Sequence, residues 1–468
     1  MKIKILQLLK RSFIWQIFII VCCGLYALAG SLINVNRFLQ YDLGYYDFGI
    51  FDVAIWKLSR FQAPIIDHFI VPGKIIFADH FNPSIFLLTP IYWFTSRSEA
   101  LLIAESLLVG LSGYVLFLIG NKILKNYFLS TSVVLAYFLF IGLQNAIYSD
   151  FHELTVMTVF LMLTYWAMFN SRKKLFLLFF IITLGFKESL FLLGIGVSIF
   201  VFLYKKEWRK LSIATFLASL LWGFIAIKII IAGLSPTYQY APKNIGGITD
   251  ILVQMVSPLI KLQTLFWTGL SFLFLPLFSP ALWPLFLLHY SHRFLTEGAI
   301  RWDLGLHYNA EIAPTLAIAS VCALAWIQKG KLHKLSYVIA FLLIINSLFL
   351  HRFIFHGPLG LAYHPAFYKH TNDFAFLNKM IQAVPKDAKI AAQNNLTVPF
   401  LHNNVYILRD DYKKHTPDYI LIDARDGQSP GNYLGISDIK NLLQRLLSDK
   451  KYSIYYHEGD QYVFKKVN

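Results

Sequence analysis

The chain has 468 residues, of which 57% are hydrophobic, 17% aromatic and only 15% charged. Because ordinary soluble domains carry about 25% charged residues, one soluble core cannot bury this much apolar surface, and lipid is expected to cover part of it. The net charge of +16 does not indicate a nucleic-acid partner, since the basic residues form short clusters between apolar segments rather than one stripe. All three cysteines lie inside apolar runs, which excludes a disulfide framework and a paired zinc motif.

The N-terminal segment predicts an uncleaved first membrane span. Basic residues precede about twenty apolar ones, a run too long for a signal peptide, and no small-residue cleavage site ends it. By the positive-inside rule, the basic clusters mark cytoplasmic loops. The clusters are Lys2/Lys4/Lys10/Arg11, Lys122/Lys125, Arg172/Lys173/Lys174, Lys205/Lys206/Arg209/Lys210 and Lys329/Lys331/Lys334.

The apolar runs between these clusters predict a mainly α fold, a polytopic transmembrane helix bundle of about eleven spans. The N-terminus is expected to be cytoplasmic, in the plasma membrane. The segment 82–95, interrupted by Pro83 and Pro90, is predicted as an interfacial or re-entrant helix within a long first outer loop, 34–99. The expected spans are 12–33, 100–120, 127–147, 153–170, 174–186, 188–204, 210–233, 260–277, 280–293, 311–328 and 335–351.

The composition becomes more polar after the last predicted span. The chain is therefore expected to divide into a transmembrane domain, 1–352, and a small extracytoplasmic α/β domain, 353–468. Ser437 is a good N-cap for a helix over 438–447. The other predicted elements are a helix at 372–383, strands at 388–392, 405–409 and 419–423, and a hairpin of 452–456 with 461–464.

Two acids in the first outer loop, Asp47 and Asp52, are the candidate catalytic residues. On one helix they would diverge by about 140°, so they are not expected to act as a paired site. A single ionised carboxylate that faces a pocket can serve as a general base. Alternatively, Asp47 caps a helix over 48–58.

A second polar group, Asp150, His152 and Glu153, ends one of the predicted spans. Asp150 and Glu153 are three residues apart and would share a face if one helix continued through both. Such oxygen ligands can hold a divalent cation, which is the one cofactor the sequence suggests. The alternative is a hydrated helix end.

Three more polar groups are candidates for substrate binding. Lys187, next to Glu188, suits an anionic phosphate as a point charge, or else the two residues form a salt bridge between spans. His80 could bind a phosphate oxygen or a metal, or lie hydrated at the interface. His307 and Tyr308 either line a pocket or belong to the interfacial aromatic belt.

Together these motifs resemble the DUF2079 family of predicted membrane proteins, in the same order over nearly the whole chain. The family is similar in layout to the C-type (GT-C) membrane glycosyltransferases, which take a sugar from a polyprenyl-phosphate carrier. The resemblance implies that Asp52 or Asp47 is the first-loop acid and Asp150 or Glu153 the second; an Asp-x-Asp pair is absent from the sequence. The matching strings are Tyr46–Trp56, His80–Pro83, Phe151–Glu153, Lys187–Glu188, His307–Tyr308 and Val384–Ala388.

The expected function is glycosyl transfer at the outer face of the membrane. The partners would be membrane lipid, a polyprenyl-phosphate-linked sugar and a glycan or lipid acceptor of the cell envelope. The alternative is a transporter or lipid flippase without transferase activity, which the lack of an internal repeat and the one-sided polar residues disfavour. The expected substrate-binding residues are His80, Asp150, His152, Glu153, Lys187, Glu188, His307 and Tyr308.

Overall fold

The computed structural model describes residues 2–68, 71, 73–235, 238, 240, 246–331, 333–370 and 372–467. Their contacts divide the chain into two compact units. The first, called here the helical unit, comprises Met1–Ile33, His80–Ile85 and Ile103–Tyr363. The second, the loop–sheet unit, comprises Asn34–Asp79, Phe86–Leu102 and His364–Asn468. Most of the first loop therefore folds with the C-terminal residues.

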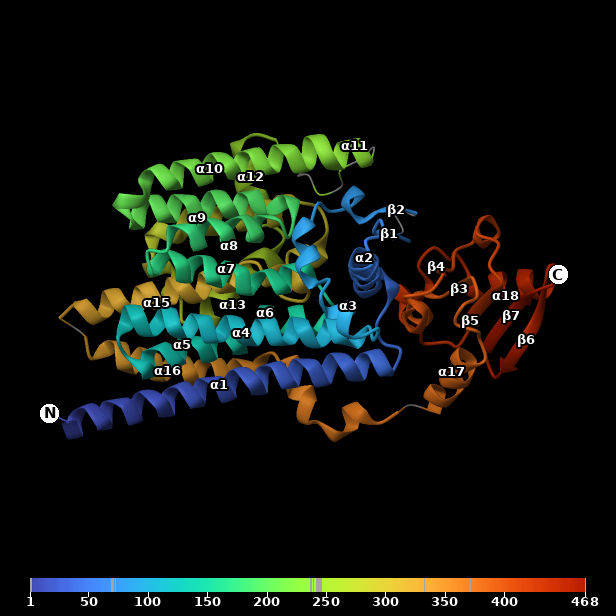
Figure 1. The fold of residues 1–468 in the computed structure, drawn as a ribbon, viewed down its shortest axis with the longest axis horizontal. Coiled ribbons are helices and arrows are strands. Elements are labelled where there is room, and N and C mark those ends of the chain that lie inside the picture. Colours follow the sequence, from blue (N-terminus) through green and yellow to red (C-terminus); the bar gives the residue numbers. More distant parts are fainter. Residues whose placement is uncertain are drawn as a thin grey trace. The chain divides into compact units, whose positions relative to one another are not determined.

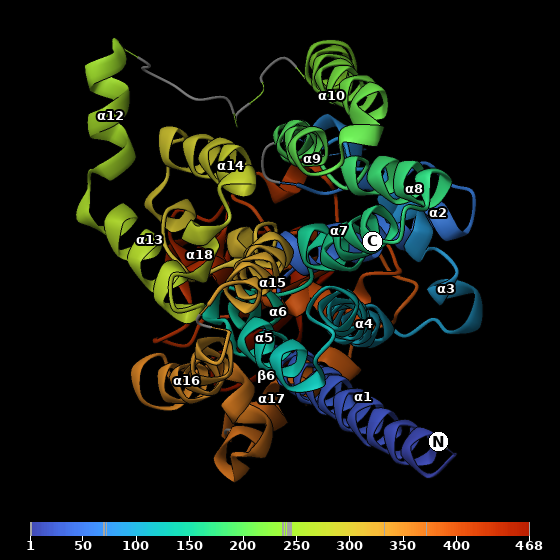
Figure 2. The same cartoon turned by 90° about the vertical axis from the view of Figure 1, so that its left-hand side faces the viewer.

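The helical unit consists mainly of apolar helices that pack on neighbours both close and distant in sequence. Helix α9 packs on α10 and α14, α7 on α8, and α5 on α15 and α16, and in Figure 2 several of these helices are seen nearly end-on. The helices are α1 (Lys2–Leu39), α4 (Glu99–Leu124), α5 (Tyr127–Leu139), α6 (Ile141–Tyr148), α7 (Glu153–Phe169), α8 (Lys173–Leu184), α9 (Phe191–Tyr204), α10 (Arg209–Phe224), α11 (Ala232–Leu234), α12 (Ile248–Val256), α13 (Leu259–Ser271), α14 (Trp283–Leu295), α15 (Ala313–Lys329) and α16 (Leu335–Phe349).

Each predicted span coincides with at least one of these helices. How many of the helices cross the membrane stays a prediction. Within the described residues, five segments are long and apolar enough to cross a membrane, or seven if two bent helix pairs each form one span. The pairs α5–α6 and α12–α13 bend by 46° and 63°. Three shorter apolar segments are Pro83–Phe94, Glu153–Phe169 and Glu188–Tyr204.

The chain turns sharply between α6 and α7. Helix α6 ends at Tyr148, Asp150 adopts a positive φ of 71°, and α7 begins only at Glu153. A left-handed residue cannot continue a right-handed helix. No single helix therefore runs through Asp150 and Glu153, so the condition under which they would share a helix face is not met.

The loop–sheet unit contains a five-stranded sheet in the order β4-β3-β5-β7-β6 (Figure 1). Strands β3, β4 and β5 are parallel, and β6 and β7 form the predicted antiparallel hairpin. All five residues of β5 are buried, as is typical of a central strand in a parallel sheet. The strands are β3 (Ile390–Ala392), β4 (Val405–Ile407), β5 (Tyr419–Asp423), β6 (Tyr452–Glu458) and β7 (Gln461–Lys466).

Two helices accompany this sheet, α17 (Asn372–Gln382) and α18 (Ile439–Leu447). Leu442 and Leu446 of α18 are fully buried in the core cluster of the sheet. The N-cap of α18 is Asp438, whose side chain accepts a hydrogen bond from the Asn441 N–H at 3.0 Å. The prediction of Ser437 as the cap was thus one residue too early, because the aspartate one position later reaches the same free N–H groups.

The first loop contributes helix α2 (Ile50–Ser59), a short hairpin of β1 (Ile65–Ile66) and β2 (Lys74–Ile75), and helix α3 (Ile91–Phe94). Asp47 does not cap a helix over 48–58. It lies in a kink with φ 71° inside the turn Tyr45–Gly49, and α2 begins after Gly49 without a side-chain cap. The segment 82–95 forms a 3-10 helix (Pro83–Leu88) and then α3, which Pro90 precedes.

An ion pair joins this loop to the exposed edge of the sheet. Asp67 accepts hydrogen bonds from Arg409 Nη2 at 2.9 Å and from the Ile407 N–H of the edge strand β4 at 2.7 Å. Both charged side chains are almost entirely buried. Asp67 thereby satisfies a backbone donor that an edge strand would otherwise leave open.

We predict that Asp67→Ala destabilises the loop–sheet unit by about 3 kcal/mol, because Arg409 would be left buried without its partner. Denaturant unfolding of the purified protein measures this change. The double variant Asp67→Ala/Arg409→Ala should recover part of the loss. Lys413→Gln, which removes a pair with Asp449 at a largely exposed lysine, is the control. An Asp67→Ala variant no less stable than this control would contradict the assigned role.

Candidate functional site

Ionisable side chains from distant parts of the sequence meet inside the helical unit. We call this set the ionic cluster; every member is at most 9% exposed. Such groups are costly in an apolar environment unless they are paired, so their grouping is the main candidate for a site. The members are His80, His152, Glu153, Lys187, Glu188 and His307.

Glu153 occupies one half of the cluster and receives two donors. Lys187 Nζ lies 3.2 Å from its Oε1, and His152 Nδ1 lies 3.0 Å from its Oε2. The rings of His152 and His307 stack with centroids 3.3 Å apart. Tyr308 continues this arrangement, with its ring centroid 4.2 Å from that of His307.

Glu188 occupies the other half. His80 Nδ1 lies 2.9 Å from Glu188 Oε1, and the Tyr238 hydroxyl donates to the same oxygen at 3.1 Å. The other oxygen, Oε2, accepts from the Phe81 N–H at 3.2 Å. The His80 ring also stacks on Tyr240, with centroids 4.3 Å apart. Because Lys187 and Glu188 are adjacent in sequence, they link the two halves.

The structure therefore brings together seven of the eight predicted substrate-binding residues. Asp150, the eighth, lies in the turn before α7 and is only half-buried. Among the described residues, no group of three or more His, Cys, Asp or Glu side chains is arranged to hold a metal ion. The cluster instead combines one lysine and three imidazoles with two carboxylates, a composition that suits an anionic ligand.

Two glycines permit the close packing that positions the cluster. A Cβ on Gly185, at the end of α8, would lie 2.3 Å from Ser84 Oγ, and the Ser84 N–H donates to Gly185 O at 2.8 Å. This contact holds the segment that carries His80. A Cβ on Gly142 would lie 2.4 Å from Asn309 Cβ, beside the 3-10 turn His307–Asn309.

A buried arginine, Arg293, holds the loop that carries His307. This arginine was not among the residues predicted from the sequence. Arg293 donates from Nη1 to Asn309 Oδ1 and from Nη2 to Asp303 O, both at 2.7 Å. The Glu105 carboxylate, also missed, accepts from the His152 N–H at 3.0 Å. An acidic residue within an apolar helix is rare, so the sequence could have indicated Glu105 as a candidate residue of the site.

Asp52, the predicted catalytic acid, belongs to the loop–sheet unit and is fully buried there. Its carboxylate receives the Tyr92 hydroxyl on one oxygen, and His402 Nε2 at 2.7 Å and Ser98 Oγ at 3.1 Å on the other. The His402 ring stacks on Trp56 at 3.9 Å between centroids. Asp47 takes no part in these contacts. Nothing in the sequence near Asp52 indicated His402, which lies far along the chain.

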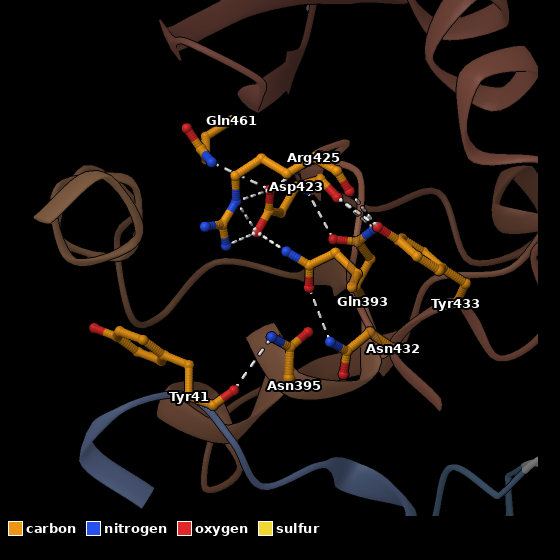
Figure 3. A network of polar contacts seen from close by, with 9 residues as sticks. Tyr41, Gln393, Asn395, Asp423, Arg425, Asn432, Tyr433 and Gln461 are labelled. Atoms are coloured by element: carbon orange, nitrogen blue, oxygen red, sulfur yellow. Dashed lines mark hydrogen bonds and ion pairs between the residues drawn. The ribbon is translucent and has the colours of Figure 1, made fainter. Parts of the chain in front are cut away.

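The carboxyl end of the parallel strands, where open α/β sheets bind ligands, is closed in this protein. Figure 3 shows Asp423, at the end of β5, with both oxygens engaged. Arg425 Nε donates to Oδ1 at 2.8 Å, Gln428 Nε2 to Oδ2 at 2.7 Å, and Gln461 Nε2 to Oδ1 at 3.1 Å. Burial and then the Asp423 charge raise the pKa of the nearby Tyr433 to about 12, so this hydroxyl stays a donor. Both oxygens of Asp423 are thus occupied by protein donors, and the network stabilises the end of β5 instead of binding a ligand.

Known structures share this fold over almost its full length. The chain aligns with ArnT from Cupriavidus metallidurans in the apo state with a TM-score of 0.53 and 11% identity, covering 96% of this chain and 98% of that one. The same protein bound to undecaprenyl phosphate gives a TM-score of 0.51 and 11% identity, covering 95% and 97%. The chain therefore has a mainly helical, ArnT-like fold with a small sheet near the C-terminus.

Residues 39–463 match the family model described as "Predicted membrane protein (DUF2079)". The chain belongs to this family, and the recognition made from the sequence motifs is confirmed. It is accordingly a membrane protein. No curated protein matches the sequence.

We predict that Gly185→Ala destabilises the helical unit by about 1–3 kcal/mol, because the added methyl group overlaps Ser84 Oγ. Ser84→Ala removes that oxygen and leaves Ser84 Cβ, 3.3 Å from the added carbon, as the nearest contact. In a double-mutant cycle measured by thermal unfolding, Ser84→Ala should therefore reduce the cost of Gly185→Ala.

Gly24→Ala provides the control, since nothing lies within 4 Å of a Cβ at that position of α1. It should leave stability unchanged or raise it by up to about 1 kcal/mol, because alanine is a better helix former than glycine. Strict additivity of Gly185→Ala and Ser84→Ala would show that the close approach of the two segments does not require a glycine.

Proposed function

We propose that this protein is a membrane glycosyltransferase that moves a sugar from a polyprenyl-phosphate donor to an envelope acceptor at the outer face of the membrane. Two observations support this proposal. The fold aligns along nearly its whole length with a protein whose structure was solved with bound undecaprenyl phosphate, which is a polyprenyl phosphate. The ionic cluster also gathers cationic side chains inside the helical unit.

The observation that carries the proposal is Lys187, which is buried and paired with Glu153 in a cluster that also contains three imidazoles. The ammonium group of Lys187 supplies a positive charge, and the imidazoles of His80, His152 and His307 supply further polar nitrogen atoms. These groups favour a phosphate in the cluster. A buried cation stabilises an anion far more than a hydrated one does, because the low-dielectric surroundings screen it weakly.

In the proposed reaction, an acceptor hydroxyl attacks the anomeric carbon of the lipid-linked sugar. The new glycosidic C–O bond forms as the bond between that carbon and the phosphate oxygen breaks, and both electrons of the broken bond leave with the polyprenyl phosphate. The acceptor proton passes to the Asp52 carboxylate. Because Tyr92, Ser98 and His402 already occupy that carboxylate, the acceptor hydroxyl must displace one of them.

We expect Asp52→Asn to lower the incorporation of radiolabelled lipid-linked sugar by about a hundredfold or more, since the amide cannot accept the proton. The assay uses membrane vesicles that contain equal amounts of inserted protein. Asp47→Asn is the matched control, because that acid lies in the same loop outside the contacts of Asp52. Unchanged labelling in Asp52→Asn would remove Asp52 from the mechanism.

Lys187→Gln should weaken the binding of polyprenyl phosphate by at least about tenfold, because charged hydrogen bonds contribute roughly 1.5–3 kcal/mol. Photo-crosslinking with a labelled polyprenyl phosphate measures this binding. Lys205→Gln is the control, since Lys205 is also buried and faces a glutamate, Glu207, at 3.8 Å. Equal crosslinking in the two variants would exclude Lys187 as the phosphate ligand.

The transporter or flippase alternative makes a different prediction. It requires translocation of a lipid-linked sugar without formation of a new glycosidic bond. Mass spectrometry of envelope glycans and glycolipids from a strain lacking the protein distinguishes the two. A transferase deletion removes one sugar from an acceptor, and the Asp52→Asn variant should reproduce that loss.

A further inference from the structure

The loop–sheet unit contains a cavity, separate from Asp52, with a volume of about 430 Å³. Helix α2 and the β1–β2 hairpin form one wall, and strand β4 with the turn Tyr412–Lys414 forms the other. The ion pair between Asp67 and Arg409 joins the two walls. The cavity is thus held open by a fixed frame, and its volume lies within the range typical of small-molecule sites.

The cavity has a surplus of positive charge. Of its two carboxylates, Asp67 pairs with Arg409, and Asp411 lies 3.0 Å from Lys414 Nζ. Lys57 has no carboxylate within ion-pair distance among the described residues; its ammonium donates to Ile65 O at 2.6 Å. Partial burial lowers the pKa of Lys57. An anionic ligand would supply the missing partner.

The remaining lining groups suit hydroxyl groups and a flat sugar face. Asn403 and Asn404 are exposed, and backbone hydrogen bonds hold them in the turn before β4. The Tyr406 ring stacks on His415 with centroids 4.6 Å apart, which gives a fixed aromatic surface. A purely apolar ligand would bury the amides and the ammonium group without hydrogen bonds, at a cost of several kcal/mol.

We propose that this cavity binds one acidic sugar unit, with Lys57 facing the acid and Asn403 and Asn404 facing the hydroxyl groups. The acid is a carboxylate or a phosphate. The further assignment of this sugar to the transferase's acceptor rests on the proposed function, whereas the binding itself does not.

Binding to the purified full-length protein in nanodiscs tests the proposal without a donor or turnover. The probes are glucose, glucuronic acid, glucose 6-phosphate and inorganic phosphate, titrated by saturation-transfer NMR. Both acidic sugars, or one of them, should bind at least about tenfold more tightly than glucose, a difference of about 1.4 kcal/mol. The tighter of the two identifies the acid.

Lys57→Gln should bring the acidic sugars to within about twofold of glucose, since only the charge–charge attraction is lost. The glutamine keeps a donor for Ile65 O, so the fold is preserved, which thermal unfolding checks. Lys413→Gln, whose pair with Asp449 lies outside the cavity, should change nothing.

Three results would overturn the proposal: equal affinity for glucose and the acidic sugars, no effect of Lys57→Gln, or inorganic phosphate binding as tightly as the tighter of the two acidic sugars. Selective sugar binding together with an absence of sugar transfer would reject the proposed function and leave this inference standing.

Discussion

Four buried carboxylates of this protein each face a cation or an imidazole from a distant part of the chain, and the structure depends on these pairings. Glu153 meets Lys187, Glu188 meets His80, Asp52 meets His402, and Asp67 meets Arg409. An unpaired buried charge costs several kcal/mol, so each pair fixes the relative position of two segments within its unit. The pairs therefore act as tertiary restraints, and they also concentrate the chemistry.

The same constraint explains how much the sequence could predict. Charged residues are rare in apolar sequence, so Lys187, Glu188 and Glu153 could be identified as candidate site residues. Their common location in the helical unit is consistent with that prediction. Their partners were only partly identifiable. His402 lies in a polar stretch where a histidine is unremarkable, and only the tertiary fold brings it to Asp52.

Two local alternatives fail for one reason. A helix cap at Asp47 and a helix face shared by Asp150 and Glu153 each require regular helix geometry at the aspartate, whereas both aspartates adopt positive φ values. Aspartate is one of the few residues that tolerates this conformation, so an isolated aspartate at a helix end is as consistent with a kink as with a cap. In contrast, the strands were predicted closely because buried parallel strands are continuous apolar runs between turn residues.

The extent to which a polar group is already satisfied distinguishes Asp423 from Lys57. Asp423 accepts hydrogen bonds from four side-chain nitrogen atoms, two of Arg425 and one each of Gln428 and Gln461, and its closed network leaves no position for a ligand. Lys57 is the opposite case, since a backbone carbonyl is the only acceptor that its half-buried ammonium meets among the described residues. The ionic cluster lies between these extremes: its carboxylates are paired with Lys187, His80 and His152, and these are also side chains that bind anions. An anion can therefore enter by redistributing existing pairs, at a lower cost than a site of isolated buried charges would require.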